Sequence, residues 1–271
     1  MSIVSRFAPS PTGYLHLGHA YSAWASWRRA DVWRLRLEDI DATRCRPEYA
    51  ASIAEDMQWL GLDWDGGIRV QSAHFPEYAA ALAQLEARGL IYPCFCSRAD
   101  ITRAMAAPHA AEGVYPGTCR HLPAAERADK IAAGAPYALR LDNVGASAQA
   151  GPARRFFEEG TGWVTARPER LGDVVLARRE TPASYHLCVV HDDATQGITH
   201  VIRGEDLREA THIQVLLQAL LGLPTPVYAH HRLLHGPDGR RLAKRDHSMT
   251  LREMRAAGTT AARILQNFEA A

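Results

Sequence analysis

The sequence predicts an α/β protein with a parallel sheet, on three observations. An apolar segment, "SIVSRFA" at residues 2–8, has the length of a short buried strand, and a proline-containing loop follows it. The apolar spacing from His16 to about Arg29 is that of a helix. "VWRLRLED" at 32–39 then alternates apolar side chains with arginines, as a strand does. Strand, loop, helix and strand form a βαβ unit, which favours a Rossmann-type parallel sheet.

The middle of the chain changes in texture. Two helices are expected first: residues 47–62 begin with a proline at a first-turn position, and residues 76–90 end near Gly89, a good C-cap. Between about 97 and 160 the sequence is rich in Ala, Gly and Pro and has weak periodicity. We therefore expect an inserted subdomain at 95–180.

The sheet is expected to resume after this insertion. "GITHVIRGED" and "VYAHHRLL" have strand character, and "THIQVLLQALLGL" between them predicts a helix that stops at Gly222. The expected organisation is the first half of the sheet domain at 1–94, the insertion at 95–180, the second half at 181–235, and a basic loop with a short C-terminal helical segment at 236–271.

Composition places the chain among ordinary globular proteins. Lys and Arg number 31 against 30 Asp and Glu, a net charge of +1 that neither demands nor excludes nucleic acid, because a basic face can exist within a neutral total. The N-terminus lacks the apolar core of a signal peptide, and the longest apolar run is too short to span a bilayer. Five cysteines are too few for a disulfide scaffold. We expect a reduced, cytoplasmic, monomeric protein with no membrane partner.

Two histidines stand at the start of the first helix, in "HLGH". A helix N-terminus attracts anions, because its first amides are unpaired and its macrodipole is positive there. His16 and His19 are three residues apart, on one helix face, and Gly18 between them lets a ligand approach the backbone. The pattern suits phosphate oxygens. The alternative is a polar helix start with two solvated histidines.

Three cysteines form a second candidate site. Cys94 and Cys96 are two residues apart, and Cys119 lies 23 further on. Soft thiolates gathered in a cytosolic protein suggest tetrahedral zinc. Chemistry leaves the fourth ligand open between His109 and His121, and buried free thiols are the alternative to a metal site.

Taken together, the motifs resemble the class I aminoacyl-tRNA synthetases, and more narrowly their glutamyl branch. The resemblance covers nearly the whole chain, with gaps mostly in the alanine-rich insertion, and it implies activation of L-glutamate by ATP with Mg. The residues that carry it are "RFAPSPTGYLHLGH", "LRLEDID", "GLDWDGG", "YPCFCSR", "YPGTCR", "GDVVLARR", "DDATQGITHVIRGEDL" and "PDGRRLAKR".

The resemblance implies roles for the residues that match. A substrate with one amine and two carboxylates needs an anion, here Glu38, and strong cations, here Arg6 and Arg203. The alternatives are a surface ion pair for Glu38 and a solvated arginine at 203. The implied glutamate site is Arg6, Phe7, Ala8, Pro9, Ser10, Glu38, Tyr185 and Arg203; the implied ATP site is His16, Gly18, His19, Arg241 and Lys244; and the implied catalytic residues are His16, His19 and Lys244.

Two features depart from the family pattern or extend it. In the loop "RLAKR", Arg241 replaces the family's first lysine and Ala243 its serine, while Lys244 is kept. We therefore expect a modified loop that still neutralises the transition state of adenylate formation. For the metal, the resemblance points to Tyr115 as the fourth ligand, which implies one structural zinc held by Cys94, Cys96, Tyr115 and Cys119.

The chain printed here ends at Ala271, soon after Lys244. We therefore expect no anticodon-binding domain, and a resemblance to the short paralogues that attach glutamate to queuosine in the anticodon of tRNA(Asp). Arginine pairs at 154–155 and 178–179 could contact phosphates, although surface solvation is the simpler interpretation. Two alternatives stay open: an ordinary glutamyl-type enzyme that charges a tRNA 3′ end, and a non-catalytic zinc-containing RNA-binding protein.

Overall fold

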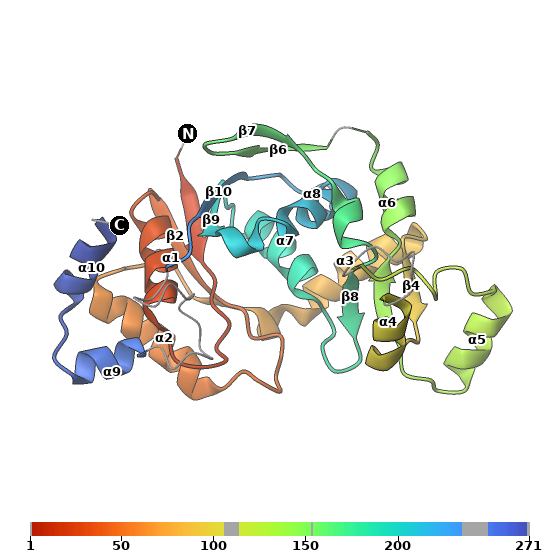
Figure 1. Cartoon of the computed structure of the whole chain (residues 1–271), viewed down its shortest axis with the longest axis horizontal. Helices are drawn as coiled ribbons and strands as arrows, with labels where there is room; N and C mark the ends of the chain where they lie inside the picture. Colours follow the sequence, from red (N-terminus) through yellow and green to blue (C-terminus); the bar gives the residue numbers. More distant parts are fainter. Residues whose placement is uncertain (1, 106–113, 153, 235–248, 270–271) are drawn as a thin grey trace.

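A computed structural model describes residues 2–105, 114–152, 154–234 and 249–269. It has the α/β architecture that the sequence predicts, with helices around parallel strands (Figure 1). The main sheet has two hydrogen-bonded groups of strands. One has the order β1-β2-β3 and is parallel, and the other has the order β7-β6-β10-β9. The strands are β1 (Val4–Phe7), β2 (Val32–Leu37), β3 (Arg69–Val70), β6 (Arg155–Glu158), β7 (Gly162–Thr165), β9 (His200–Gly204) and β10 (Val227–His231).

The two groups of strands meet where β1 lies beside β9. The backbone amide of Thr199 donates to the carbonyl of Val4 at 2.9 Å, and the hydroxyl of Ser5 donates to the carbonyl of His200 at 2.9 Å. The combined order is then 3-2-1-9-10-6-7, which reverses its direction of growth between β1 and β9. Such a switch point is where open α/β sheets bind their ligands.

The predicted helices are present, together with one in the second half of the sheet domain, α7, that the sequence analysis did not predict. Gly222 ends its helix in the left-handed region at φ 68°, as expected. Gly89 is also left-handed, but its helix ends at Ala87 with Arg88 as the cap. The additional helix, α7, follows the insertion and packs against α3 and α8. These helices are α1 (Leu17–Trp27), α2 (Pro47–Leu60), α3 (Phe75–Ala87), α7 (Tyr185–Thr195) and α8 (Ala210–Leu221).

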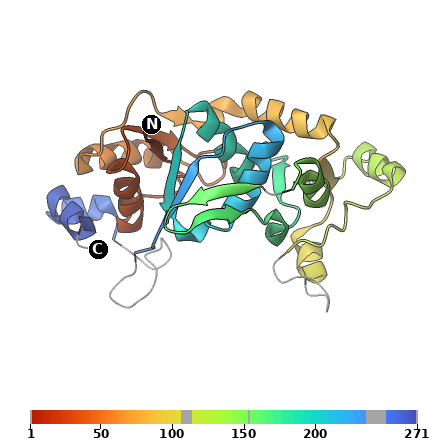
Figure 2. The same ribbon diagram turned by 90° about the horizontal axis from the view of Figure 1, so that it is seen from above.

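The segment predicted as an insertion contributes to two sheets. Its own antiparallel sheet has the order β4-β5-β8 and lies at one end of the molecule, with α4, α5 and α6 (Figures 1 and 2). Strand β4 begins before residue 95. In the main sheet β6 pairs with β10, and β7 pairs with β6. The remaining elements here are β4 (Ile91–Cys94), α4 (Arg98–Met105), α5 (Ala124–Ala132), β5 (Ala138–Leu141), α6 (Asn143–Gln149) and β8 (Val175–Arg178).

Two C-terminal helices, α9 (Leu251–Ala256) and α10 (Ala261–Glu269), lie at the opposite end of the molecule, near α1 and α2 (Figure 1). Phe268 anchors α10 by packing on Tyr21 and Trp24, with ring centroids 5.4 and 5.6 Å away. Among the described residues, no helix is both long and apolar enough to cross a membrane.

Candidate active site

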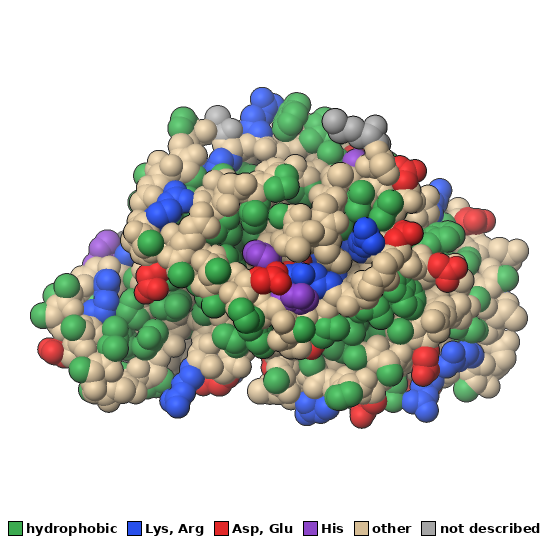
Figure 3. Space-filling model, turned by 180° about the vertical axis from the view of Figure 1, so that it is seen from behind, with side chains coloured by type: hydrophobic (Ala, Val, Ile, Leu, Met, Phe, Trp, Pro, Cys, Tyr) green, Lys and Arg blue, Asp and Glu red, His purple; other side chains and the backbone are tan. Residues whose placement is uncertain are grey.

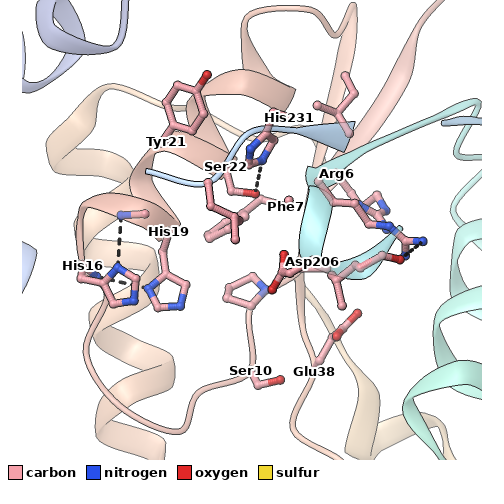
Figure 4. A pocket seen from close by; sticks show the side chains of 18 of the residues that line it. Arg6, Phe7, Ser10, His16, His19, Tyr21, Ser22, Glu38, Asp206 and His231 are labelled. Carbon is pink, nitrogen blue, oxygen red and sulfur yellow. Dashed lines mark hydrogen bonds between the residues drawn. The ribbon is translucent and has the colours of Figure 1, made fainter. Parts of the chain in front are cut away.

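A cavity of about 470 Å³ opens at the carboxyl ends of β1, β9 and β10. Histidine, acidic and basic side chains gather around a hollow near the middle of one face of the molecule (Figure 3), and a close view shows Glu38 and Ser10 pointing into the pocket (Figure 4). The structure brings the described residues of both predicted subsites to this one cavity. They are Arg6, Phe7, Ala8, Pro9, Ser10, His16, Gly18, His19, Glu38, Tyr185 and Arg203.

The two histidines cap the first helix with their rings. Nδ1 of His16 accepts the backbone N–H of Gly18 at 3.1 Å, and Nδ1 of His19 accepts the backbone N–H of His16 at 3.2 Å. The sequence analysis assumed that the first amides of α1 are unpaired, but the amide of Gly18 donates to the His16 ring. Because each Nδ1 is an acceptor, the neutral ring carries its proton on Nε2, which makes that nitrogen a donor. Two such donors suit phosphate oxygens.

Arg241 and Lys244 lie outside the described residues, but both ends of their segment are described. Leu233 and Leu234 line the cavity before it. After it, Thr250 forms a β-bridge with His16, and the amide of Leu251 donates to the carbonyl of Leu15 at 2.8 Å. The described residues before this segment therefore lie at the cavity, and those after it lie at the first turn of α1, beside the paired histidines.

A buried ion network supports the predicted amino-acid site. Arg6 donates from Nε to Asp193 at 2.9 Å, and Nη1 of Arg36 donates to the same carboxylate at 2.8 Å. Arg36 also reaches Glu38, with Nη2 3.4 Å from Oε1. Burial raises the pKa of Asp193, but the two arginines outweigh it and hold that pKa below its usual value. Arg6 thus has two of its nitrogens engaged by Asp193, which fixes its orientation.

Asp192 extends this network away from the cavity. It accepts hydrogen bonds from Arg69, Gln71 and Tyr78 at 2.8 to 2.9 Å and is completely buried. The sequence analysis gave neither Asp192 nor Asp193 a role and took Arg36 as part of a polar strand face. The sequence did contain a signal: two adjacent acids follow the apolar part of "HLCVVHDDA". Carboxylates are buried among apolar residues only when they are paired.

Two of the open alternatives are wrong. Glu38 is not a surface ion pair, because its side chain is only 8% exposed. Arg203 is not a solvated strand-end arginine: it is buried, and its Nη1 is 3.4 Å from the hydroxyl of Tyr185. Arg154 is half-buried, and its Nη1 donates to the carbonyls of Ser147 and Gly151.

Binding of glutamate, the substrate that the sequence resemblance implies, should weaken as the pH falls below about 7. Burial raises the pKa of Glu38 to about 7, against the opposing effects of Arg36 and Arg6. A protonated Glu38 cannot pair with a substrate ammonium, so we expect the apparent KM for glutamate to rise by up to about tenfold per pH unit below that value. Exchange of pyrophosphate into ATP, measured from pH 5.5 to 8.5, checks this. Glu38→Gln should have a raised KM without the pH dependence, and a flat wild-type profile would contradict the assignment.

A second cavity, of about 520 Å³, adjoins the first. The two share Ser10, Thr12, Glu38 and Tyr185. The second cavity extends toward the small antiparallel sheet and is rich in basic side chains. Its charged and titratable lining residues are Glu38, Asp41, Arg44, Cys45, Arg140, Arg178, Tyr185 and His186.

The three predicted cysteines also come together, at the start of the small sheet. The sulfurs of Cys94, Cys96 and Cys119 lie within 4.8 Å of one another. The Tyr115 hydroxyl is 3.3 Å from the Cys94 sulfur and 3.5 Å from the Cys96 sulfur, and the Cys96 and Cys119 sulfurs are 3.5 Å apart. Tetrahedral zinc with sulfur at about 2.3 Å and oxygen at about 2.0 Å requires separations of about 3.8 Å (S–S) and about 3.5 Å (S–O). The four groups therefore fit a zinc ion.

Burial and the hydrogen bonds with the Cys94 and Cys96 sulfurs raise the pKa of Tyr115, and two other contacts oppose that rise by favouring its charged form. The backbone N–H of Cys119 donates to its oxygen at 3.0 Å, and the guanidinium of Arg140 lies 3.9 Å from its ring centre. Of the alternative ligands, His121 is exposed with its Nε2 3.4 Å from Nε of Arg120, and His109 lies outside the described residues.

The fold is that of a class I aminoacyl-tRNA synthetase catalytic domain. The family model for class I tRNA synthetases (E and Q), catalytic domain, matches residues 2–268. The chain belongs to this family and is a ligase.

Several named relatives align with nearly the whole chain. It is 47% identical to the glutamyl-Q tRNA(Asp) synthetase of Rhodobacter capsulatus over 97% of this chain and 98% of that protein. It is 44% identical to the protein of the same name from Symbiobacterium thermophilum, over 95% of this chain and 83% of that protein. The crystal structure of glutamate-tRNA synthetase from Elizabethkingia anophelis superposes with a TM-score of 0.76 at 28% identity, over 91% of this chain. The chain spans about half the length, 53%, of that synthetase.

Proposed function

We propose that this protein activates L-glutamate with ATP as glutamyl-adenylate and transfers the glutamate to queuosine in the anticodon of tRNA(Asp). The observation that carries the first step is one cavity with a buried carboxylate, two buried guanidinium groups and a pair of histidine donors. Glu38 would bind the ammonium of the substrate, and Arg6 and Arg203 its carboxylates. His16 and His19 would hold the phosphates of Mg-ATP.

Charge also accounts for the choice of amino acid. A buried guanidinium that faces a carboxylate gains a charge-assisted hydrogen bond, whereas the neutral amide of glutamine leaves that positive charge uncompensated. Glutamine should therefore be a poor substrate. A site built on charged partners discriminates more strongly than one that depends on size.

The second step is the transfer of glutamate to the tRNA. We propose that the acceptor nucleotide enters the second cavity. It meets the amino-acid site across Glu38 and Tyr185, so a hydroxyl in it would approach the activated carboxyl group. Arg44 and Arg178 at its lining would contact RNA phosphates. Support for queuosine as the acceptor comes from the names of the two relatives that this chain matches at 47% and 44% identity.

We further infer that one structural zinc ion is held by Cys94, Cys96, Tyr115 and Cys119. The ion would link the end of β4 to the turn at residues 115–119. Both flank the antiparallel sheet that forms one side of the second cavity, so the metal would stabilise the wall against which the RNA docks.

The function is tested in two stages. Glutamate-dependent exchange of pyrophosphate into ATP, without tRNA, should occur with glutamate and only weakly with glutamine. Labelled glutamate should then appear on tRNA(Asp) that carries queuosine, and not on tRNA(Asp) with guanosine at that position or on tRNA(Glu). Nuclease mapping should place the label on the queuosine nucleotide.

The outcomes separate the candidates. Efficient charging of tRNA(Glu) at its 3′ end would favour an ordinary glutamyl-type enzyme. Tight tRNA binding with no exchange would favour the non-catalytic RNA-binding protein.

A further inference from the structure

A buried chain of hydrogen bonds runs from the back of the amino-acid pocket into the sheet. Glu158, His230 and Arg203 lie on the neighbouring strands β6, β10 and β9. Nδ1 of His230 is 3.0 and 2.9 Å from the two carboxylate oxygens of Glu158, and its Nε2 is 3.1 Å from Nε of Arg203. The side chains of Glu158 and His230 are 3% and 0% exposed. Neither residue lines the amino-acid cavity.

The direction of each hydrogen bond follows from the chemistry of the groups. A guanidinium N–H can only donate, so Nε2 of His230 must accept. The ring is then neutral, carries its proton on Nδ1, and donates it to the Glu158 carboxylate. Burial and the charge of Arg203 lower the pKa of His230 to about 3, which keeps the ring in this neutral form at physiological pH.

A second nitrogen on the same edge of Arg203 is held as well. Its Nη2 donates to the hydroxyl of Thr211 at 2.7 Å and to the carbonyl of Leu207 at 3.2 Å. With Nε fixed by His230, and Nη2 fixed by Thr211 and Leu207, the plane of the guanidinium has one orientation. That orientation directs Nη1 to Tyr185, a residue that lines the cavity with Arg203.

We propose that Glu158 and His230 are positioning residues that hold the Arg203 guanidinium in the plane that receives a carboxylate of the amino-acid substrate. Glu158 acts through His230, because it selects the tautomer whose Nε2 can accept from Arg203. The inference rests on the proposed function, since it takes glutamate as the ligand of Arg203. Without the acceptor, a buried N–H of Arg203 loses its partner, and only the contacts of Nη1 and Nη2 still hold the plane of the guanidinium.

The test compares His230→Phe with His230→Gln in pyrophosphate exchange. Phenylalanine keeps a planar ring but removes the acceptor, so the KM for glutamate should rise by about tenfold or more while kcat and the KM for ATP stay within about threefold. Glutamine offers an amide oxygen to Arg203 and should restore most of the affinity. Glu158→Gln keeps the shape but not the charge and should give an intermediate KM.

Tyr228→Phe is the matched control for a purely structural effect. Tyr228 packs beside Arg203, and the change removes a buried hydrogen bond from Gln218 at 3.0 Å without removing an acceptor of Arg203. Its KM for glutamate should equal that of the wild type. Folding of each variant is checked by its thermal melt, and Glu158→Gln decides the question should His230→Phe not fold.

Three outcomes would overturn the inference. The first is an unchanged KM for glutamate in folded His230→Phe or Glu158→Gln, and the second is a parallel rise in the KM for ATP. The third is a wild-type enzyme without glutamate-dependent exchange, which would remove the proposed function at the same time. An active wild type with unaffected variants removes only the positioning role.

Discussion

Replacing Asp193 by alanine should destabilise the protein by about 3–5 kcal/mol and abolish glutamate activation. The change leaves Arg6 and Arg36 buried without the carboxylate that both of them contact at 2.8 to 2.9 Å. Arg36 keeps the side-chain oxygen of Gln196 at 2.9 Å and the carboxylates of Glu38 and Asp192 at 3.4 and 3.9 Å, whereas Arg6 loses the carboxylate that engages two of its nitrogens. The loss is large because a buried, unpaired guanidinium keeps its desolvation penalty. Urea denaturation of wild type and variant measures the difference.

The matched control is the ion pair between Arg29 and Glu159, whose side chains are about one-third exposed. Removing Glu159 should cost no more than about 1 kcal/mol, because solvent screens the pair and replaces the lost partner. A loss below about 1 kcal/mol for Asp193→Ala, similar to that for Glu159→Ala, would contradict the role given to the buried network.

The pH dependence of stability provides an independent check on Asp193. Its folded-state pKa lies below the ordinary value of 3.8, so its contribution is present above that pH. The contribution should be lost as the pH falls through the folded-state pKa. Wild type should therefore lose more stability on acidification than Asp193→Asn, which has no carboxylate at this position.

Local patterns were enough to predict most of the main sheet. The unit from β1 to β2 has a distinct apolar period in each element, and Gly222 ends α8 where the sequence indicates. Helix α7 was not predicted, because Asp192 and Asp193 interrupt its apolar pattern and are nevertheless buried. The pairing of β6 with β10 joins residues about 70 positions apart, Glu158 and Tyr228, and no local signal specifies such a contact.

Only part of the candidate site, likewise, could be predicted from local sequence patterns. The residues that line the pocket stand in motifs that the sequence displays, so the resemblance to the glutamyl branch could single them out. Their supporting partners could not be found this way: Asp193 meets Arg6 across 187 positions and Arg36 across 157. An arginine in a strand can face solvent or a distant carboxylate, and only the tertiary structure distinguishes the two.

Protein purified without added zinc should contain about one equivalent of the metal, and Cys119→Ser should lose it. The expected effect on the small antiparallel sheet is large. The cluster joins β4 to the turn at residues 115–119, and the apolar core around it is small, with Tyr92 as its only large buried side chain beyond the four ligands among the described residues. Metal analysis and thermal melts before and after chelation measure the content and the loss of stability.

Two further variants identify the fourth ligand. Tyr115→Phe keeps the ring beneath Arg140 but removes the oxygen that lies 3.3 to 3.5 Å from two sulfurs, so it should weaken zinc binding. His121→Ala is the matched control, because His121 points to Arg120 and its removal should leave the metal in place. Full metal retention in Tyr115→Phe together with loss in His121→Ala would transfer the fourth position to the histidine. A Cys119→Ser protein with unchanged zinc and an unchanged melt would exclude the site itself, since tetrahedral thiolate coordination cannot lose one of its sulfurs without a measurable loss of affinity.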